Sequence, residues 1–131
     1  MILDTEFCIS LRAEEAAALE LAAALEASGV PTRVPTIVVE ELYVGVGAGA
    51  TPETNAQAYD ALVANMPIVP LDERIARRAG QLEGEHLTSK SKPNLGPGDA
   101  IVAATGLVHE EAVVTNDGDF ERIDGLTVES Y

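Results

Sequence analysis

The stretch Asp99-Ala-Ile-Val-Ala-Ala-Thr-Gly-Leu-Val-His109, followed closely by Ala112-Val-Val-Thr115, decides the fold. Its first part has the length and the small aliphatic residues of a helix, and its second part is a short buried strand. Strands separated by helices are typical of parallel sheets, whose strands read as continuous aliphatic runs. The same alternation continues along the chain on both sides. It predicts an α/β fold, a parallel β-sheet flanked by helices on both faces.

The remaining elements follow from the positions of the apolar runs and of Gly, Pro and capping residues. Further strands are expected at Ile2-Leu3, Arg33-Val34, Ile68-Val69 and Leu126-Thr127-Val128. Further helices are expected at 11–28 (or a pair there), from a Thr36 cap to about 46, at 52–65, at 73–87 after an Asp72 cap, and near Phe120. The glycines of 45–49 are expected to break the helix that begins at Thr36. Residues 88–98 are expected to form a loop. Residues 1–131 are interpreted as one domain, because no repeat or linker divides them.

Four acidic side chains stand where this pattern brings them together: Asp4, Glu41, Asp99 and Asp117. Asp4 and Asp117 each follow a strand, and sites in parallel sheets form at the carboxyl ends of strands. Asp99 opens a helix after Gly-Pro-Gly, and Glu41 lies on an aliphatic helix, whereas Glu40 points about 100° away from it, towards solvent. Converging carboxylates repel one another without cations, and their oxygens are preferred ligands of Mg²⁺ and Mn²⁺. The pattern predicts a metal site suited to phosphodiester hydrolysis.

Each acid also has a simpler interpretation. Asp4 and Asp99 could each cap a helix, and Asp117 could serve the turn Asn116-Asp117-Gly118-Asp119. Capping does not explain Glu41, which stands in mid-helix among Ile, Val and Leu. A shared site explains the four acids together better than four separate causes. Asp119 is the main rival to Asp117, since both could approach the metal.

The order and spacing of these motifs resemble a PIN domain of the type found in VapC toxins of prokaryotic toxin–antitoxin pairs. The resemblance spans Met1 to Tyr131. The pieces that carry it are Ile-Leu-Asp4-Thr5, Glu41-Leu42-Tyr43 followed by Gly45, Asp99-Ala-Ile-Val-Ala-Ala-Thr105, and Val-Val-Thr115-Asn116-Asp117-Gly-Asp119-Phe120.

The resemblance implies a PIN-like sheet and a Mg²⁺- or Mn²⁺-dependent endoribonuclease. The residues that it makes catalytic are Asp4, Glu41, Asp99 and Asp117. Asp4, Asp99 and Asp117 would hold the metal, with Glu41 orienting water or a second ion. The residues that would hold these ligands in place are Thr5, Thr115, Asn116 and Asp119. It also implies an RNA substrate, a cognate antitoxin protein and a homodimer.

A PIN-fold interaction domain, or a housekeeping RNA-processing domain that is not a toxin, is the alternative. A degenerate PIN domain would usually have lost one acid, and none is missing here. A phospho-acceptor regulator is disfavoured, because it needs an acidic pair near the start and a Lys after the last core strand. Here Asp4 is followed by Thr5-Glu6, and the last Lys is Lys92.

The charge of the chain is −14, from 22 acidic and 8 basic residues. RNA binding usually rests on basic patches, so this charge is unexpected. Bound metal would neutralise part of it, and a salt-rich cytoplasm would screen the rest, which suggests a halophilic archaeon. Cys8 is the only cysteine, so we expect a reducing cytoplasm and a buried apolar role for this thiol. No membrane-spanning segment is expected.

Five of the eight basic residues fall between positions 74 and 92. Arg74, Arg77 and Arg78 share one helix face, which we interpret as a solvated face pairing with surplus acids. Lys90 and Lys92 lie in the loop before Asp99 and are predicted to contact RNA phosphates. His86 and His109 are expected on helix surfaces. Gly45-Val-Gly-Ala-Gly49 is not a phosphate loop, because it follows a helix and lacks Gly-Lys-Ser/Thr.

Overall fold

The computed structural model describes residues 1–131, apart from the side chain of residue 52. All strand pairs in the described chain are parallel. The strands β1 (Ile2–Leu3), β4 (Val113–Val114) and β5 (Val128–Glu129) pair in the order β1-β4-β5, and β2 (Val34–Pro35) pairs with β3 (Ile68–Val69). A parallel bridge between Ile2 and Arg33 joins these two groups. Across the joined sheet the order is therefore β3-β2-β1-β4-β5.

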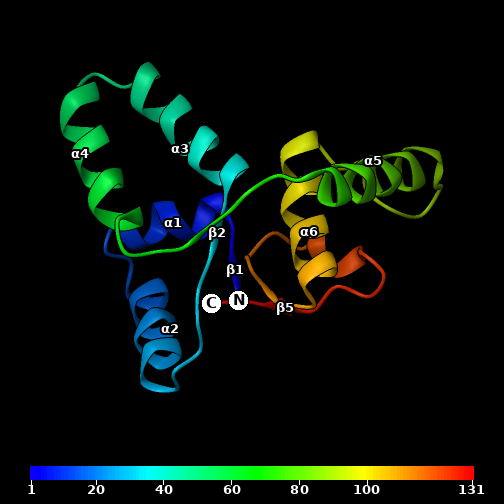
Figure 1. Cartoon of the computed structure of the whole chain (residues 1–131), viewed down its shortest axis with the longest axis horizontal. Coiled ribbons are helices and arrows are strands. Elements are labelled where there is room, and N and C mark those ends of the chain that lie inside the picture. The colour runs from blue at the N-terminus through cyan, green and yellow to red at the C-terminus, as the bar shows by residue number, and fades with distance from the viewer.

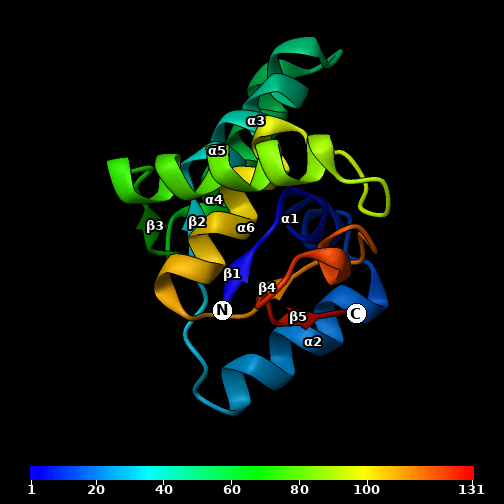
Figure 2. The same cartoon turned by 90° about the vertical axis from the view of Figure 1, so that its right-hand side faces the viewer.

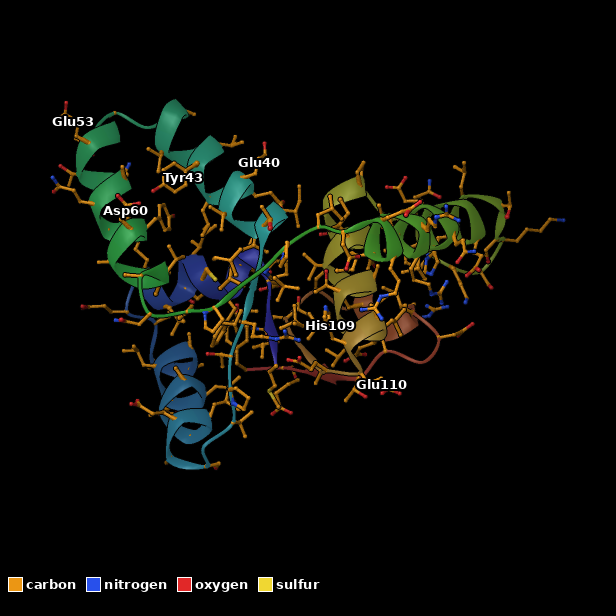
Figure 3. The ribbon with its side chains drawn as sticks, in the orientation of Figure 1. Glu40, Tyr43, Glu53, Asp60, His109 and Glu110 are labelled. Carbon is orange, nitrogen blue, oxygen red and sulfur yellow. The ribbon has the colours of Figure 1, made fainter. Side chains whose placement is uncertain are left out.

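The helices lie on both sides of the strands, as the sequence predicts. They are α1 (Thr5–Arg12), α2 (Ala16–Ala27), α3 (Thr36–Ala48), α4 (Pro52–Val63), α5 (Glu73–Thr88) and α6 (Pro97–His109), with a 3₁₀ turn η1 (Phe120–Arg122). Figure 1 shows α1 to α4 on one side of the strands and α5 and α6 on the other. Figure 2 shows α5 crossing α6, with which it packs. The helices α3 and α4 form an arm, where Tyr43 and Asp60 are hydrogen-bonded (Figure 3).

The core is built from aliphatic residues of the strands and small residues of α6. Ile2 and Val113 are completely buried, and Ala103 of α6 is buried as deeply. Gly106 lets α6 approach the sheet, because a Cβ there would lie 2.8 Å from a methyl group of Val113. Phe7 and Phe120 are the largest fully buried side chains in the described chain. Small residues on α6 thus hold the helix that carries Asp99 close to the strands.

Several predicted boundaries are wrong. The expected helix over 11–28 is a pair, but its first member begins at Thr5 and the break falls where Glu14 adopts a φ of 57°. Thr36 does not cap α3, because its hydroxyl donates instead to the carbonyl of Val69 at 3.0 Å. The glycines at 45 and 47 do not break α3, which continues to Ala48. Val46 is buried on α3, and this packing outweighs the low helix propensity of its glycine neighbours.

Two further corrections concern the second half of the chain. Helix α6 begins at Pro97, so Gly98 belongs to its first turn and Asp99 does not cap it. His86 is not on the surface: its side chain is 1% exposed, and its Nδ1 lies 2.8 Å from the carbonyl of Pro93. The buried face of α5 explains this, since Ile75, Ala79, Leu82 and His86 follow one helical stripe. No helix in the described chain is long and apolar enough to cross a membrane.

Candidate active site

The four acids predicted from the sequence line one pocket, although they come from four separate elements. The pocket has a volume of about 230 Å³, and its polar lining is Asp4, Thr5, Glu6, Glu41, Asp99 and Asp117. Ile9, Val102 and Phe120 form its apolar wall. A larger cavity of about 510 Å³ lies between α1, α2 and the end of α4, but it is mainly apolar and contains none of the four acids. The smaller pocket is therefore the candidate for catalysis.

Asp4 has two roles, because it caps α1 and also faces the pocket. Its Oδ1 accepts a hydrogen bond from the backbone N–H of Phe7 at 2.7 Å. Burial raises the pKa of Asp4 to about 6, even though hydrogen bonds from Thr115 and Phe7 favour its charged form. Asp4 can therefore be both a helix cap and a site residue, because only its Oδ1 is used to cap α1.

Glu41 reaches the pocket from α3. The Thr5 hydroxyl donates to Glu41 Oε1 at 3.2 Å. Burial raises the pKa of Glu41, and the charge of Asp99 raises it further. Gly98 allows this carboxylate to lie against the start of α6, because a Cβ at Gly98 would be 3.1 Å from Oε1. Glu40 is exposed and projects away from the ribbon (Figure 3), which confirms the prediction that the neighbouring acids diverge.

Asp99 and Asp117 face each other from α6 and from the turn after β4. Burial raises the pKa of Asp99, and the charges of Asp117 and Asp119 add to this. Asp117 Oδ1 accepts from the N–H of Asp119 at 2.9 Å, and Thr115 Oγ1 accepts from the N–H of Asp117 at 3.0 Å. The turn interpretation of Asp117 is thus also correct. The turn fixes the Asp117 carboxylate at the pocket.

The pocket fits a divalent cation in the type of its donor groups. All its acidic groups offer hard oxygen ligands, and a cation would offset both the desolvation and the mutual repulsion that raise these pKa values. Asp4, Glu41 and Asp117 each accept a hydrogen bond at one carboxylate oxygen, and this bond orients the carboxylate. Among the described side chains, no three acidic, histidine or cysteine groups already lie at metal-binding spacing. The fit therefore rests on the type of the donor groups.

Apart from Thr5, the other residues that the sequence predicts around the site do not line the pocket. Thr115 is buried behind Asp4, but Asn116 points to the chain end, where its Oδ1 accepts from the N–H of Tyr131 at 2.8 Å. Lys90 and Lys92 do not line the pocket. Lys92 Nζ lies 2.6 Å from Asp124 Oδ2.

Two findings concern residues near the start of α1. Glu6 lines the pocket and was missed by the sequence analysis, although its position in the first turn after Asp4 could have indicated it. Cys8 is completely buried, and burial raises the pKa of its thiol to about 12. This confirms its predicted role as an apolar core residue, because the thiolate is the nucleophilic form.

The fold and the pocket define an α/β protein with an acid-lined site at the carboxyl edge of a parallel sheet. A family model described as PIN domain matches residues 1–126, so the chain belongs to the PIN domain family. This confirms the resemblance on which the sequence analysis rests. No curated protein matches the chain in a sequence search.

Solved structures give the same result for the fold. A chain in the crystal structure of VapBC2 from Rickettsia felis, bound to a DNA fragment from its promoter, matches with a TM-score of 0.89 and 22% identity over 99% of this chain and 97% of that chain. A chain of VapBC-5 from Mycobacterium tuberculosis, a member of the VapBC family of toxin–antitoxin systems, is 31% identical, with a TM-score of 0.60 over 76% and 79% of the chains. Mycobacterium tuberculosis VapC20, described as a sarcin-ricin loop cleaving toxin, matches with a TM-score of 0.69 and 18% identity over 96% of this chain and 95% of that chain.

Proposed function

We propose that this protein is a divalent-metal-dependent endoribonuclease and the toxin of a VapBC-type pair. The observation that carries the proposal is the convergence of Asp4, Glu41, Asp99 and Asp117, from four separate elements, on one pocket. Membership of the PIN domain family supports a nuclease. The similar chains from VapBC structures support the toxin role, as does the similarity to VapC20, which is described as a sarcin-ricin loop cleaving toxin.

In this proposal the pocket residues bind and orient. Asp4, Asp99 and Asp117 would hold Mg²⁺ or Mn²⁺, which when bound supplies an acidified water and stabilises charge on the phosphate and the leaving oxygen. Glu41, held by Thr5, would orient the attacking water. Thr115 would keep the Asp117 turn in place. The apolar wall of Ile9, Val102 and Phe120 would limit the water around the reacting phosphate.

The chemistry is tested by cleavage of a single-stranded RNA with Mn²⁺. We expect Asp4→Asn and Asp99→Asn to stay folded and to lose cleavage by roughly 100-fold or more, because each removes a carboxylate that would hold the metal beside the reacting phosphate. Glu40→Gln is the matched control, since it removes one negative charge beside Glu41 but outside the pocket, and it should cleave like the wild type. Wild-type activity in either Asp variant would refute the assignment.

The toxin role predicts a partner. An acid-lined pocket is a suitable receptor for an inserted Arg or Lys, so we expect a small antitoxin whose basic side chain reaches Asp4 and Asp99. We also expect a homodimer formed through the helices of residues 11–28 and 36–65, which include α2, α3 and α4. Expression with and without the adjacent open reading frame tests the toxin role in the cytoplasm. Growth arrest that the neighbouring gene relieves, and that Asp4→Asn abolishes, is the expected result.

The alternative functions give different results. RNA cleavage without growth arrest would favour a housekeeping RNA-processing enzyme. Calorimetric titration with Mn²⁺ separates the interaction-domain alternative, because the wild type would then bind no more metal than Asp4→Asn does.

A further inference from the structure

The charge of the chain is divided very unevenly. Residues 1–73 have a net charge of −10 and residues 99–131 have −7, whereas residues 74–98 have +3, which together make up the −14 of the chain. The positive segment, defined as residues 74–98, consists of α5 after its first residue, the connection to α6 and the first two residues of α6. It ends one residue before Asp99. Side-chain nitrogen atoms accordingly gather around α5 in Figure 3.

The arginines of α5 lie beside its buried stripe and remain accessible. Arg77 pairs with Glu73 at 2.7 Å, but both side chains are more than three quarters exposed, at 76% and 78%. Arg78 lies 3.8 Å from Glu85, and Arg74 is exposed and forms no ion pair with any side chain that the structure describes. Exposed pairs of this kind are weak, so a phosphate group can replace the acid.

The two lysines of the segment differ. Lys92 is bound to Asp124, and the neighbouring Ser91 carbonyl accepts from Arg122 Nη2 at 2.7 Å. The Pro93 carbonyl contacts the buried His86. These contacts fix the connection against α5 and η1, so Lys92 serves as an anchor. Lys90 is exposed and forms no ion pair in the described part of the chain.

We propose that Arg74, Arg77, Arg78 and Lys90 form the surface that binds the phosphate backbone of the RNA substrate and leads it to the pocket. The proposal rests on the proposed function and deepens it. From the sequence, phosphate contact is expected only of Lys90 and Lys92. Here the three arginines also contact phosphate, and Lys92 does not, because it is paired with Asp124.

The chemistry of this surface favours RNA over an acidic protein. The arginine side of α5 continues through Gln81 and Glu85 and offers no large apolar side chain. A protein interface normally needs an apolar or aromatic anchor at its centre, whereas arginine matches a phosphate with two parallel hydrogen bonds. In a chain of this overall charge, RNA can approach the pocket with least repulsion over the positive segment.

The test measures RNA binding without metal, by fluorescence anisotropy of a labelled single-stranded RNA in EDTA across a salt series. Arg74→Gln and Lys90→Gln should each lower the magnitude of the salt slope by about 0.7, the value for one phosphate contact on a single strand. The triple variant Arg74→Gln/Arg77→Gln/Arg78→Gln should lower it by about 2 and weaken binding roughly tenfold or more. Arg12→Gln is the matched control, because it removes one exposed charge from α1, where Arg12 contacts Asn55 and Tyr59.

The control separates a local contact from an effect of net charge. The proposal is wrong if Arg74→Gln and Lys90→Gln weaken binding no more than Arg12→Gln does, or if the wild type does not bind RNA at low salt. It is also wrong if polyglutamate binds this surface as tightly as RNA does and loses affinity in the same variants, which would indicate an acidic protein partner. Because EDTA prevents metal binding, these results are independent of the cleavage test of Asp4 and Asp99.

Discussion

The acidic pocket and the positive segment carry their charges in opposite ways. In the pocket, Asp4 is 7% exposed, and none of the ion pairs in the described chain involves it, Glu41, Asp99 or Asp117. On α5, arginines stand in water next to exposed acids. Burial without a counter-ion destabilises the charged form, whereas solvation leaves it stable. A bound cation would therefore stabilise the pocket, whereas the arginines of α5 are stable in solvent without a ligand.

The largest expected effect is the response of the pocket to metal. Mn²⁺ at a thousandfold excess over its dissociation constant should raise the free energy of unfolding of the wild type by about 4.1 kcal/mol. Asp4→Asn should lose most of this gain, and Glu40→Gln should keep it, because only Asp4 lines the pocket. Thermal and urea unfolding with and without Mn²⁺ measure the difference. An equal gain in the Asp4 variant would show that the metal binds elsewhere.

The second effect is the pH dependence of the metal-free protein. The pKa of Asp4 is raised by burial from 3.8 to about 6, so between these values the folded state binds more protons than the unfolded state. The contribution of Asp4 to stability is therefore fully present below pH about 4 and is lost as the pH rises through about 6. Asp4→Asn stays neutral and still caps α1, so it should be more stable than the wild type above pH 6, by up to about 3 kcal/mol.

Urea unfolding in EDTA between pH about 4 and about 7 measures this difference. A constant difference between Asp4→Asn and the wild type would mean that burial does not control the ionisation of Asp4.

The third effect separates stability from activity at Gly98. Alanine in the first turn of α6 should stabilise the helix by about 0.5–1 kcal/mol, because it reduces the freedom of the unfolded chain. Its Cβ would lie 3.1 Å from Glu41 Oε1 and push that carboxylate aside. We expect unfolding free energy to be kept or raised while Mn²⁺-dependent RNA cleavage falls. Gly84→Ala, where nothing lies within 4 Å, is the control and should leave cleavage unchanged.

The smallest effect concerns the positive segment. Arg77→Gln removes the exposed pair with Glu73 and should lower the free energy of unfolding by no more than about 0.5 kcal/mol. Its effect on the salt dependence of RNA binding should be clearly measurable. A loss of stability much larger than this in chemical denaturation would show that Arg77 is part of the structure and not free to bind phosphate.

The sequence was a good guide to the site and a weaker guide to the helix boundaries. The sequence predicts that four acids converge, because each stands next to an aliphatic run. All four line the same pocket: Asp4, Glu41, Asp99 and Asp117. The end of α3 was misjudged, because propensity alone does not include the burial of Val46. Glu6 and the pairing of Lys92 with Asp124 depend on long-range packing, which local patterns do not report.

What the sequence by itself determined is the alternation of strands and helices, the identity of the four acids and the isolation of positive charge in residues 74–98. These depend on the order of residues along the chain. The tertiary structure alone decided that Asp4 is buried deeply enough to shift its pKa, that Gly98 makes room for Glu41, and that His86 and Lys92 are structural. The physical reason is that desolvation and close packing arise between segments far apart in sequence, and these interactions exist only once the sheet has assembled.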